Sequence, residues 1–186
     1  MRLDGTYGAK AAVGGIAGVL AKVTAAAPDK YQAVRSQILE KLSMDGTMDV
    51  QLPAEEKDKN GDASNASSVR YGVGGIVGYA YLANEGNGIT KLNTCENQAD
   101  VTGNLFTGGI VGKLEGSIEH GKGLSEADHA AVASVAGSSS DGLILSSVSA
   151  DDKTFAGQYF GGVTGYSYNA VLYDCETASG RARGYS

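Results

Sequence analysis

Val73-Gly74-Gly75-Ile76-Val77-Gly78 and, 34 residues further on, Thr107-Gly108-Gly109-Ile110-Val111-Gly112 are two copies of one short block. The block recurs twice more, as Val13-Gly14-Gly15-Ile16-Ala17-Gly18 and Phe160-Gly161-Gly162-Val163-Thr164-Gly165. Four copies make an internal repeat, which is typical of proteins that stack equivalent structural units. We expect its glycines to be structural, either with positive φ at a corner or where backbones approach closely. These glycines are Gly14, Gly15, Gly18, Gly74, Gly75, Gly78, Gly108, Gly109, Gly112, Gly161, Gly162 and Gly165.

A second pattern, of alternating apolar and polar residues, lies between the glycine blocks. Met44–Val50 aligns with Cys95–Val101, and the segments that start at Val148 and Cys175 begin in the same way. Alternation of this kind predicts half-buried strands. Aromatic residues stand just before or at the start of three glycine blocks, and we expect them to stack between successive coils. They are Tyr71, Phe106, Tyr159 and Phe160.

The spacing between the two patterns is regular. Thirteen residues separate Cys95 from Gly108, and the same number separates Val148 from Gly161. One unit therefore has about 26 residues, within the range of solenoid repeats. The blocks start 60, 34 and 53 residues apart, so insertions of variable length interrupt the unit. We predict one mainly β domain over residues 1–186, a β-solenoid or β-helix-like repeat of about four coils with two short helical insertions.

Three stretches are expected to lie outside the repeated core, at about residues 24–41, 53–68 and 119–138. In the first, a helix that begins at Pro28 would place four apolar residues on one face, namely Tyr31, Val34, Ile38 and Leu42. The second is rich in charged and small polar residues and is expected to be a solvated loop. In the third, Ser125–Asp128 resembles a capping box before an Ala-rich helix that Gly137 would end.

Composition excludes several classes of partner. The 186 residues carry a net charge of −6, which argues against nucleic acid as a partner. No apolar run approaches the roughly 20 residues of a membrane-spanning helix, so we expect no membrane insertion. The apolar stretch Ala11–Ala21 is similar to a secretory signal, but it contains the first glycine block and is assigned to the repeat.

Carboxylates recur within the second pattern. In the alignment, Asp45, Glu96 and Glu176 share one position, and Asp49 and Asp100 share another. We expect a solvated polar face and no cofactor there; weak Ca²⁺ binding by such stacked carboxylates is the alternative.

The two cysteines, Cys95 and Cys175, are equivalent in the alignment and lie two coils apart. Two steps of about 4.8 Å separate them by roughly 9 to 10 Å. This exceeds the roughly 7 Å limit between the Cα atoms of a disulfide, so we predict two free, buried thiols.

The glycine blocks resemble the GLUG-motif repeats of bacterial surface proteins, whose core is Gly-Gly-Leu/Ile-Val-Gly followed by a polar or aromatic residue. The two inner copies match best, as Gly74–Tyr79 and Gly108–Lys113. The resemblance implies a β-solenoid, a secreted or cell-surface location, and a stalk or adhesive role within a larger polypeptide. It implies no catalytic residue.

These observations predict a non-catalytic extracellular repeat module of a bacterial surface protein. A ridge of tyrosines would contact a host glycan or protein, because tyrosine presents an apolar ring and a polar hydroxyl. The ridge residues are Tyr79, Tyr81, Tyr166 and Tyr168. The alternative is a β-helical polysaccharide-active enzyme (a lyase or hydrolase) or a glycan-binding module. An enzyme would need Asp or Glu and Arg or Lys to converge in one groove.

Overall fold

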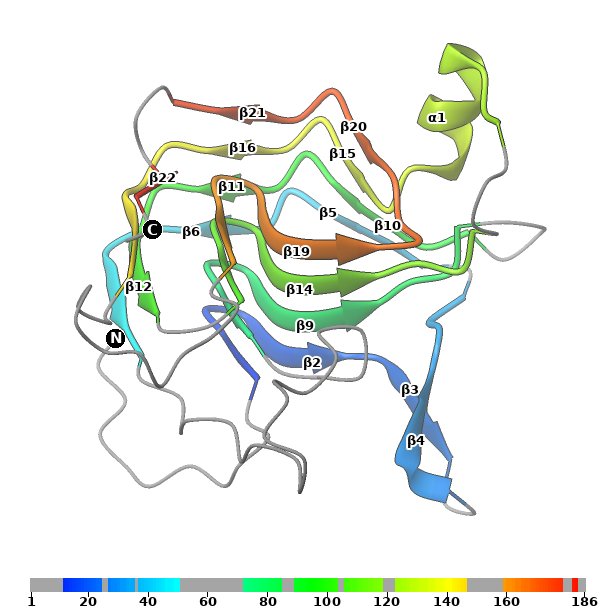
Figure 1. Ribbon diagram of the computed structural model, residues 1–186, viewed down its shortest axis with the longest axis horizontal. Helices are drawn as coiled ribbons and strands as arrows, with labels where there is room; N and C mark the ends of the chain where they lie inside the picture. Colours follow the sequence, from blue (N-terminus) through cyan, green and yellow to red (C-terminus); the bar gives the residue numbers. More distant parts are fainter. Residues whose placement is uncertain are drawn as a thin grey trace, which may run out of the picture.

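The computed structural model describes residues 12–24, 27–35, 37–50, 72–84, 89–103, 106–118, 123–146, 159–178 and 182–183. Within these residues the chain winds through four coils, and the coils stack through parallel strands (Figure 1). The prediction of a mainly β solenoid of about four coils is confirmed.

Two sheets contain the glycine blocks. The first has the strand order β1–β8–β13–β18. Its strands are β1 (Val13–Gly14), β8 (Val73–Gly74), β13 (Thr107–Gly108) and β18 (Phe160–Gly161). The second has the order β2–β9–β14–β19, and its strands are β2 (Ala17–Leu20), β9 (Val77–Tyr81), β14 (Val111–Glu115) and β19 (Thr164–Tyr168).

Three further sheets complete each coil. One comprises β5 (Ile38–Glu40), β10 (Lys91–Asn93), β15 (Val135–Ala136) and β20 (Leu172–Tyr173). The next comprises β6 (Ser43–Met44), β11 (Glu96–Asn97), β16 (Ser139–Ser140) and β21 (Glu176–Thr177). The last comprises β7 (Thr47–Asp49), β12 (Asp100–Gly103), β17 (Ile144–Ser146) and β22 (Ala182–Arg183). In each of the five sheets the strands are named here from coil 1 to coil 4. Coil 1 therefore contains β1, β2, β5, β6 and β7, and coil 2 contains β8 to β12.

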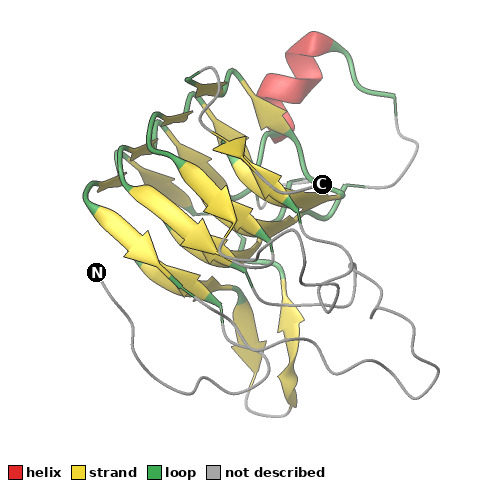
Figure 2. Ribbon diagram, turned by 60° about the vertical axis from the view of Figure 1, so that its left-hand side comes forward, coloured by secondary structure: helices red, strands yellow, loops and turns green. Residues whose placement is uncertain are grey.

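The glycine blocks lie in register from coil to coil. Gly74 pairs with Gly14 on one side and with Gly108 on the other, and Gly108 also pairs with Gly161. The ladder of strands is visible in Figure 2, where strands of the same sheet run side by side. Each block therefore occupies the same place in its own coil, as the repeat predicts.

In coils 1, 2 and 3 the second glycine of the block allows two backbones to approach closely. A Cβ atom at Gly75 would clash with the carbonyl oxygen of Gly109 in the next coil and with the side chain of Asn97 across the coil. A Cβ atom at Gly109 would clash in the same way with Gly162 and Ser140. A side chain at this position is thus excluded by the stacking itself.

None of the block glycines has a positive φ, so the expectation that they form a left-handed corner is wrong. That corner lies elsewhere in the coil. It separates the β5 sheet from the β6 sheet, and its residues occupy one position in all four coils. These residues are Lys41 (φ 56°), Thr94 (φ 49°), Gly137 (φ 51°) and Asp174 (φ 51°). Three of the four coils make this left-handed corner without glycine, so it left no glycine pattern in the sequence.

The apolar residues form two clusters. One lies between the β1 and β7 sheets and includes Val73, Val101 and Ile144. The other lies within the β2, β5 and β6 sheets and includes Ile76, Ile110 and other residues of coils 2 and 3. Burial of these side chains against successive coils provides the main stabilisation.

One of the two predicted helices is present. Helix α1 (Glu126–Val132) begins after Ser125, whose side chain accepts from the Asp128 amide while Asp128 caps in return. The helix is shorter than predicted, because Val135–Ala136 forms strand β15 of the core instead of a last helical turn.

The other predicted helix is wrong. Residues there form an antiparallel hairpin of β3 (Lys22–Thr24) and β4 (Ala27–Gln32), which projects from coil 1 (Figure 1). After it, Val34 bridges to Leu82 and the chain rejoins the coil at β5. The helix-like spacing of Val34 and Leu42 arises because both return to the solenoid core. The expected loop at 53–68 lies outside the described residues.

The alignment of the second pattern also needs correction. The residues equivalent to Cys95 are Leu42 in coil 1 and Ser138 in coil 3, not Met44 and Val148. Val148 lies outside the described residues. Coil 3 uses alanine and serine at core positions, so its strands show no apolar alternation that an alignment would detect.

Candidate functional site

The predicted ridge lies on one face of the β2–β9–β14–β19 sheet, where register places its residues in two columns. Tyr79, Lys113 and Tyr166 are direct neighbours in one column, which we call the inner column. Tyr81, Glu115 and Tyr168 are neighbours in the other, which we call the outer column. The tyrosines therefore do line up, but coil 3 contributes a lysine and a glutamate between them.

The inner column is largely enclosed. Tyr79 is completely buried, and its hydroxyl donates a 2.6 Å hydrogen bond to Oε2 of Glu115. The expectation that Tyr79 contacts a ligand is therefore wrong. Its ring packs inside the protein because the neighbouring coil covers it and the Glu115 carboxylate occupies its hydroxyl.

Lys113 is the most unusual side chain of this face, because it is fully buried and charged. Its Nζ lies 2.9 Å from Oε1 of Glu115. It also lies 5.5 Å, 5.7 Å and 6.0 Å from the ring centroids of Tyr166, Phe106 and Tyr79. A carboxylate and three aromatic faces together replace the water that a buried ammonium loses.

Three aromatic rings close this cluster on the side of coil 4. Phe106 stacks on Tyr159 with ring centroids 5.2 Å apart, and Tyr166 packs against both rings. Phe106 and Tyr159 lie directly before β13 and β18, so the predicted stacking of pre-block aromatics is confirmed for this pair. Burial, assisted by Tyr159, Tyr168 and Glu115, raises the pKa of the Tyr166 hydroxyl above its ordinary value. Tyr71 lies outside the described residues.

The outer column remains accessible. Tyr168 is exposed, and Tyr81 and Glu115 are partly buried. The exposed part of the ridge thus comprises Tyr168, Tyr81 and the accessible edge of Tyr166. Sequence reasoning missed Lys113 and Glu115 because it followed one residue type; counting positions from each glycine block would have placed them in these columns.

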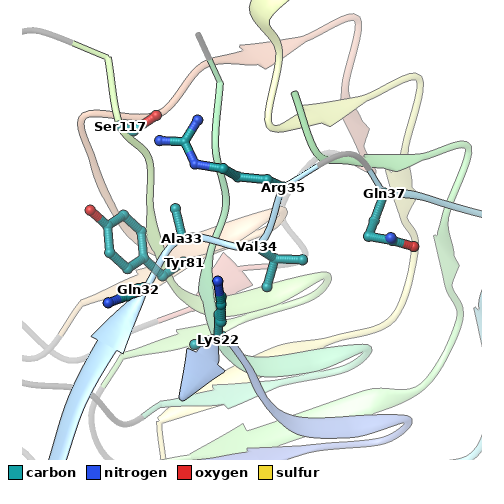
Figure 3. A pocket seen from close by; sticks show the side chains of 9 residues that line it. Lys22, Gln32, Ala33, Val34, Arg35, Gln37, Tyr81 and Ser117 are labelled. Carbon is teal, nitrogen blue, oxygen red and sulfur yellow. The ribbon is translucent and has the colours of Figure 1, made fainter. Parts of the chain in front are cut away.

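A pocket of about 610 Å³ lies at the end of the sheet nearest coil 1 (Figure 3). It is lined by hairpin β3–β4, the segment that follows the hairpin, Tyr81 at the end of β9, and Ser117 after β14. Its lining residues are Ala21, Lys22, Gln32, Ala33, Val34, Arg35, Gln37, Tyr81 and Ser117. Tyr81 is the one residue of the predicted ridge that belongs to this pocket. Sequence reasoning did not find the pocket, since it predicted a helix that begins at Pro28 where the structure has the hairpin.

The stacked carboxylates are arranged differently from the alignment. Glu96 and Glu176 do share a column, but Ser139 separates them and Ser43 continues the column in coil 1. Asp45 falls two residues beyond this column. Asp49 pairs with Thr102, and Asp100 with Thr47, so these two carboxylates are not equivalent.

In the described residues, no group of three or more His, Cys, Asp or Glu side chains is positioned to hold a metal ion.

The two thiols occupy equivalent positions two coils apart, as predicted, with Ser138 between them. Both are free; Cys95 is buried and Cys175 is half-buried. Burial raises the pKa of each thiol above its ordinary value.

Among the described residues, the single helix α1, with seven residues, is too short to cross a membrane.

No protein-family model, no curated protein and no solved structure matches this chain.

Proposed function

We propose that this chain is a non-catalytic solenoid module of a larger bacterial surface or secreted protein, with a stalk and adhesive role. The motif resemblance to GLUG repeats supports the location. The observation that carries the stalk role is the pair of open, matching edges at the two ends of the coil stack.

Among the described residues, the strands at each end of the stack are paired on one side only. Within the described residues, coil 1 pairs only with coil 2, and coil 4 pairs only with coil 3, in all five solenoid sheets. Every outer strand therefore has backbone donors and acceptors available for another parallel strand. A further coil of the same shape would satisfy them.

Apolar side chains are exposed at both ends. Ile16 and Val19 of coil 1 are 49% and 41% exposed, although their equivalents in coils 2 and 3 are fully buried. Leu172 and Tyr168 of coil 4 are 36% and 44% exposed. A further coil stacked on either end would bury these side chains as the central coils bury theirs, and this burial would stabilise the contact.

The charges at one corner are complementary. Lys41 of coil 1 and Asp174 of coil 4 hold the same corner position, and both are exposed. If coil 1 of one module stacks on coil 4 of the preceding module, these two residues become neighbours about 4.8 Å apart along the ladder. The contact would therefore be head-to-tail, which extends a fibre rather than closing a ring.

The exposed edge residue Ile16 gives a direct test by sedimentation equilibrium. We expect the chain to self-associate with rising concentration, and Ile16→Lys to weaken this about tenfold or more, since a lysine cannot be buried at the new contact. Gln98→Lys, on an exposed side position of coil 2, is the matched control and should leave association unchanged. A chain that stays monomeric at millimolar concentration, or an Ile16→Lys variant that associates normally, would contradict the stacking role.

The charge pair gives a second, smaller test. Lys41→Asp should weaken association about threefold because it faces Asp174 across the contact. The double variant Lys41→Asp/Asp174→Lys should restore it. Equal association of all three proteins would remove Lys41 and Asp174 from the contact.

A further inference from the structure

We infer that the pocket at the base of hairpin β3–β4 binds a carboxylated sugar, such as a uronic acid residue of an acidic polysaccharide. The inference names the ligand class for the adhesive role, and it rests on the proposed function for that biological setting.

The charge of the pocket is opposite to that of the whole chain. Among the described residues, its lining includes two cations, Lys22 and Arg35, and no carboxylate. Glu115 lies next to Tyr81 on the neighbouring strand, but its carboxylate is already paired with Lys113. The pocket is thus a local cationic site in a chain of net charge −6, which favours an anionic ligand there.

The two cationic groups reach the pocket from different segments of the chain. In Figure 3 the Arg35 side chain extends toward Ser117 on one side of the segment with Ala33 and Val34, and the Lys22 side chain rises toward that segment from the other side. A guanidinium group binds a carboxylate through two parallel hydrogen bonds, and an ammonium adds a further charged donor. Arg35 is therefore the group suited to bind the carboxylate, and Lys22 adds positive charge to the same pocket.

The other lining groups match the rest of a sugar. The face of an aromatic ring such as Tyr81 packs against the apolar C–H groups of a pyranose, and the amides of Gln32 and Gln37 both donate and accept. The Ser117 hydroxyl donates to Oδ1 of Asn84 and accepts from the backbone N–H of Asn84, so toward a ligand it is available as an acceptor. An acceptor suits a sugar hydroxyl rather than a second carboxylate. A volume of about 610 Å³ accommodates one or two sugar residues.

The backbone around Arg35 is held in place without the ligand. On one side, the Val34 amide donates to the carbonyl of Tyr81 and the Ala83 amide donates to the carbonyl of Val34, both at 2.9 Å. The Thr90 hydroxyl donates to the same Val34 carbonyl at 2.7 Å and accepts from the Gln37 amide at 3.4 Å. Arg35 therefore projects from a segment anchored on both sides, which lowers the ordering cost of binding.

The test is calorimetric titration of the whole chain with digalacturonate and with neutral lactose as the uncharged comparison. We expect digalacturonate to bind and lactose to bind at least tenfold more weakly. Arg35→Gln should weaken digalacturonate binding about tenfold or more, Arg35→Lys should retain part of the affinity, and Tyr81→Ala should weaken both sugars. Arg35 is exposed, so the two Arg35 substitutions should leave the melting temperature unchanged.

Lys41→Gln is the matched control, because it removes an exposed cation outside the pocket. It should leave sugar binding unchanged. Arg35→Gln in turn should leave self-association unchanged, so failure of the sugar site and failure of the stacking role are separately visible. Equal affinity of Arg35→Gln and the parent chain, no binding at 10 mM digalacturonate, or equal binding of the neutral sugar would each overturn the inference. Tighter binding of a sulfated disaccharide than of digalacturonate would overturn the choice of a carboxylate.

Discussion

The two central coils and the two outer coils carry the same motif but differ in burial. Ile76 and Ile110 of coils 2 and 3 are fully buried, whereas Ile16 in the same block position of coil 1 is half exposed. Leu92 and Val135 are fully buried, whereas Leu172 of coil 4 is partly exposed. The motif therefore determines the shape of a coil, and the neighbouring coils determine how much that shape contributes to stability.

The largest expected contrast is between two equivalent glycines. Gly109→Ala should cost more than about 4 kcal/mol of unfolding free energy or prevent folding, because its Cβ meets the backbone of Gly162 in the next coil. Gly162→Ala should cost less, about 2–3 kcal/mol, because its Cβ meets the side chain of exposed Thr177, whose Cβ must shift, but meets no backbone of a further coil. Chemical denaturation of both variants measures the difference. Equal costs would mean that stacking does not impose the glycine.

The isoleucines give the next contrast. Ile110→Ala should destabilise the chain by about 3 kcal/mol, because it leaves a cavity in the core cluster. Ile16→Ala, at the same block position in coil 1, should cost about 1 kcal/mol or less. Both values come from denaturation at a concentration low enough to keep the chain monomeric. A large loss at Ile16 in the monomer would show that coil 1 is already covered.

At the left-handed corner, substitutions in the two central coils should change the unfolding free energy by smaller amounts, and in opposite directions. Thr94→Gly should stabilise the chain by about 0.5–1 kcal/mol, since a β-branched residue is strained at positive φ. Gly137→Ala, at the same corner in coil 3, should destabilise it by about 1 kcal/mol. Thermal unfolding distinguishes the two. Destabilisation by Thr94→Gly would indicate that the threonine side chain contributes more than its backbone strain removes.

The thiols predict a pH dependence. Their pKa values are raised in the folded state, so the folded chain binds more protons than the unfolded chain once the unfolded thiols begin to ionise. Their contribution is fully present below about pH 9 and is lost as pH rises through the folded-state values. The Cys95→Ala/Cys175→Ala variant should therefore lose less stability between pH 8 and pH 10 than the parent chain, as measured by denaturant midpoints. Equal losses would assign the alkaline effect to other groups such as Tyr166.

The frame of the fold was predictable from the glycine blocks, since four copies specify four coils and their mutual register. The second strand pattern was harder, because Ser138 and Ser140 of coil 3 are small polar residues that fit a crowded interior without apolar alternation. The hairpin was misread because Val34 and Leu42 have helical spacing for an unrelated reason, their separate returns to the core. Local periodicity does not distinguish these origins.

The candidate site was predictable only in part. Three of the four ridge tyrosines retain accessible surface, and Tyr79 does not. The burial of Tyr79 depends on Lys113 and Glu115, which come from a different coil and interact through the ladder rather than along the chain. The cationic pocket depends on the hairpin, so it was invisible once that segment was assigned to a helix.

The hairpin after coil 1 strand β2 and the helix before coil 3 strand β15 leave the solenoid at the same junction, between the β2 and β5 sheets. Strand β10 nevertheless pairs with both β5 and β15 without a register shift. The length and sequence of the segment inserted at this junction therefore do not alter the pairing of the solenoid strands. Diversification there would exchange one recognition loop for another while the supporting ladder stays the same, which makes the junction a natural site for grafting new binding segments.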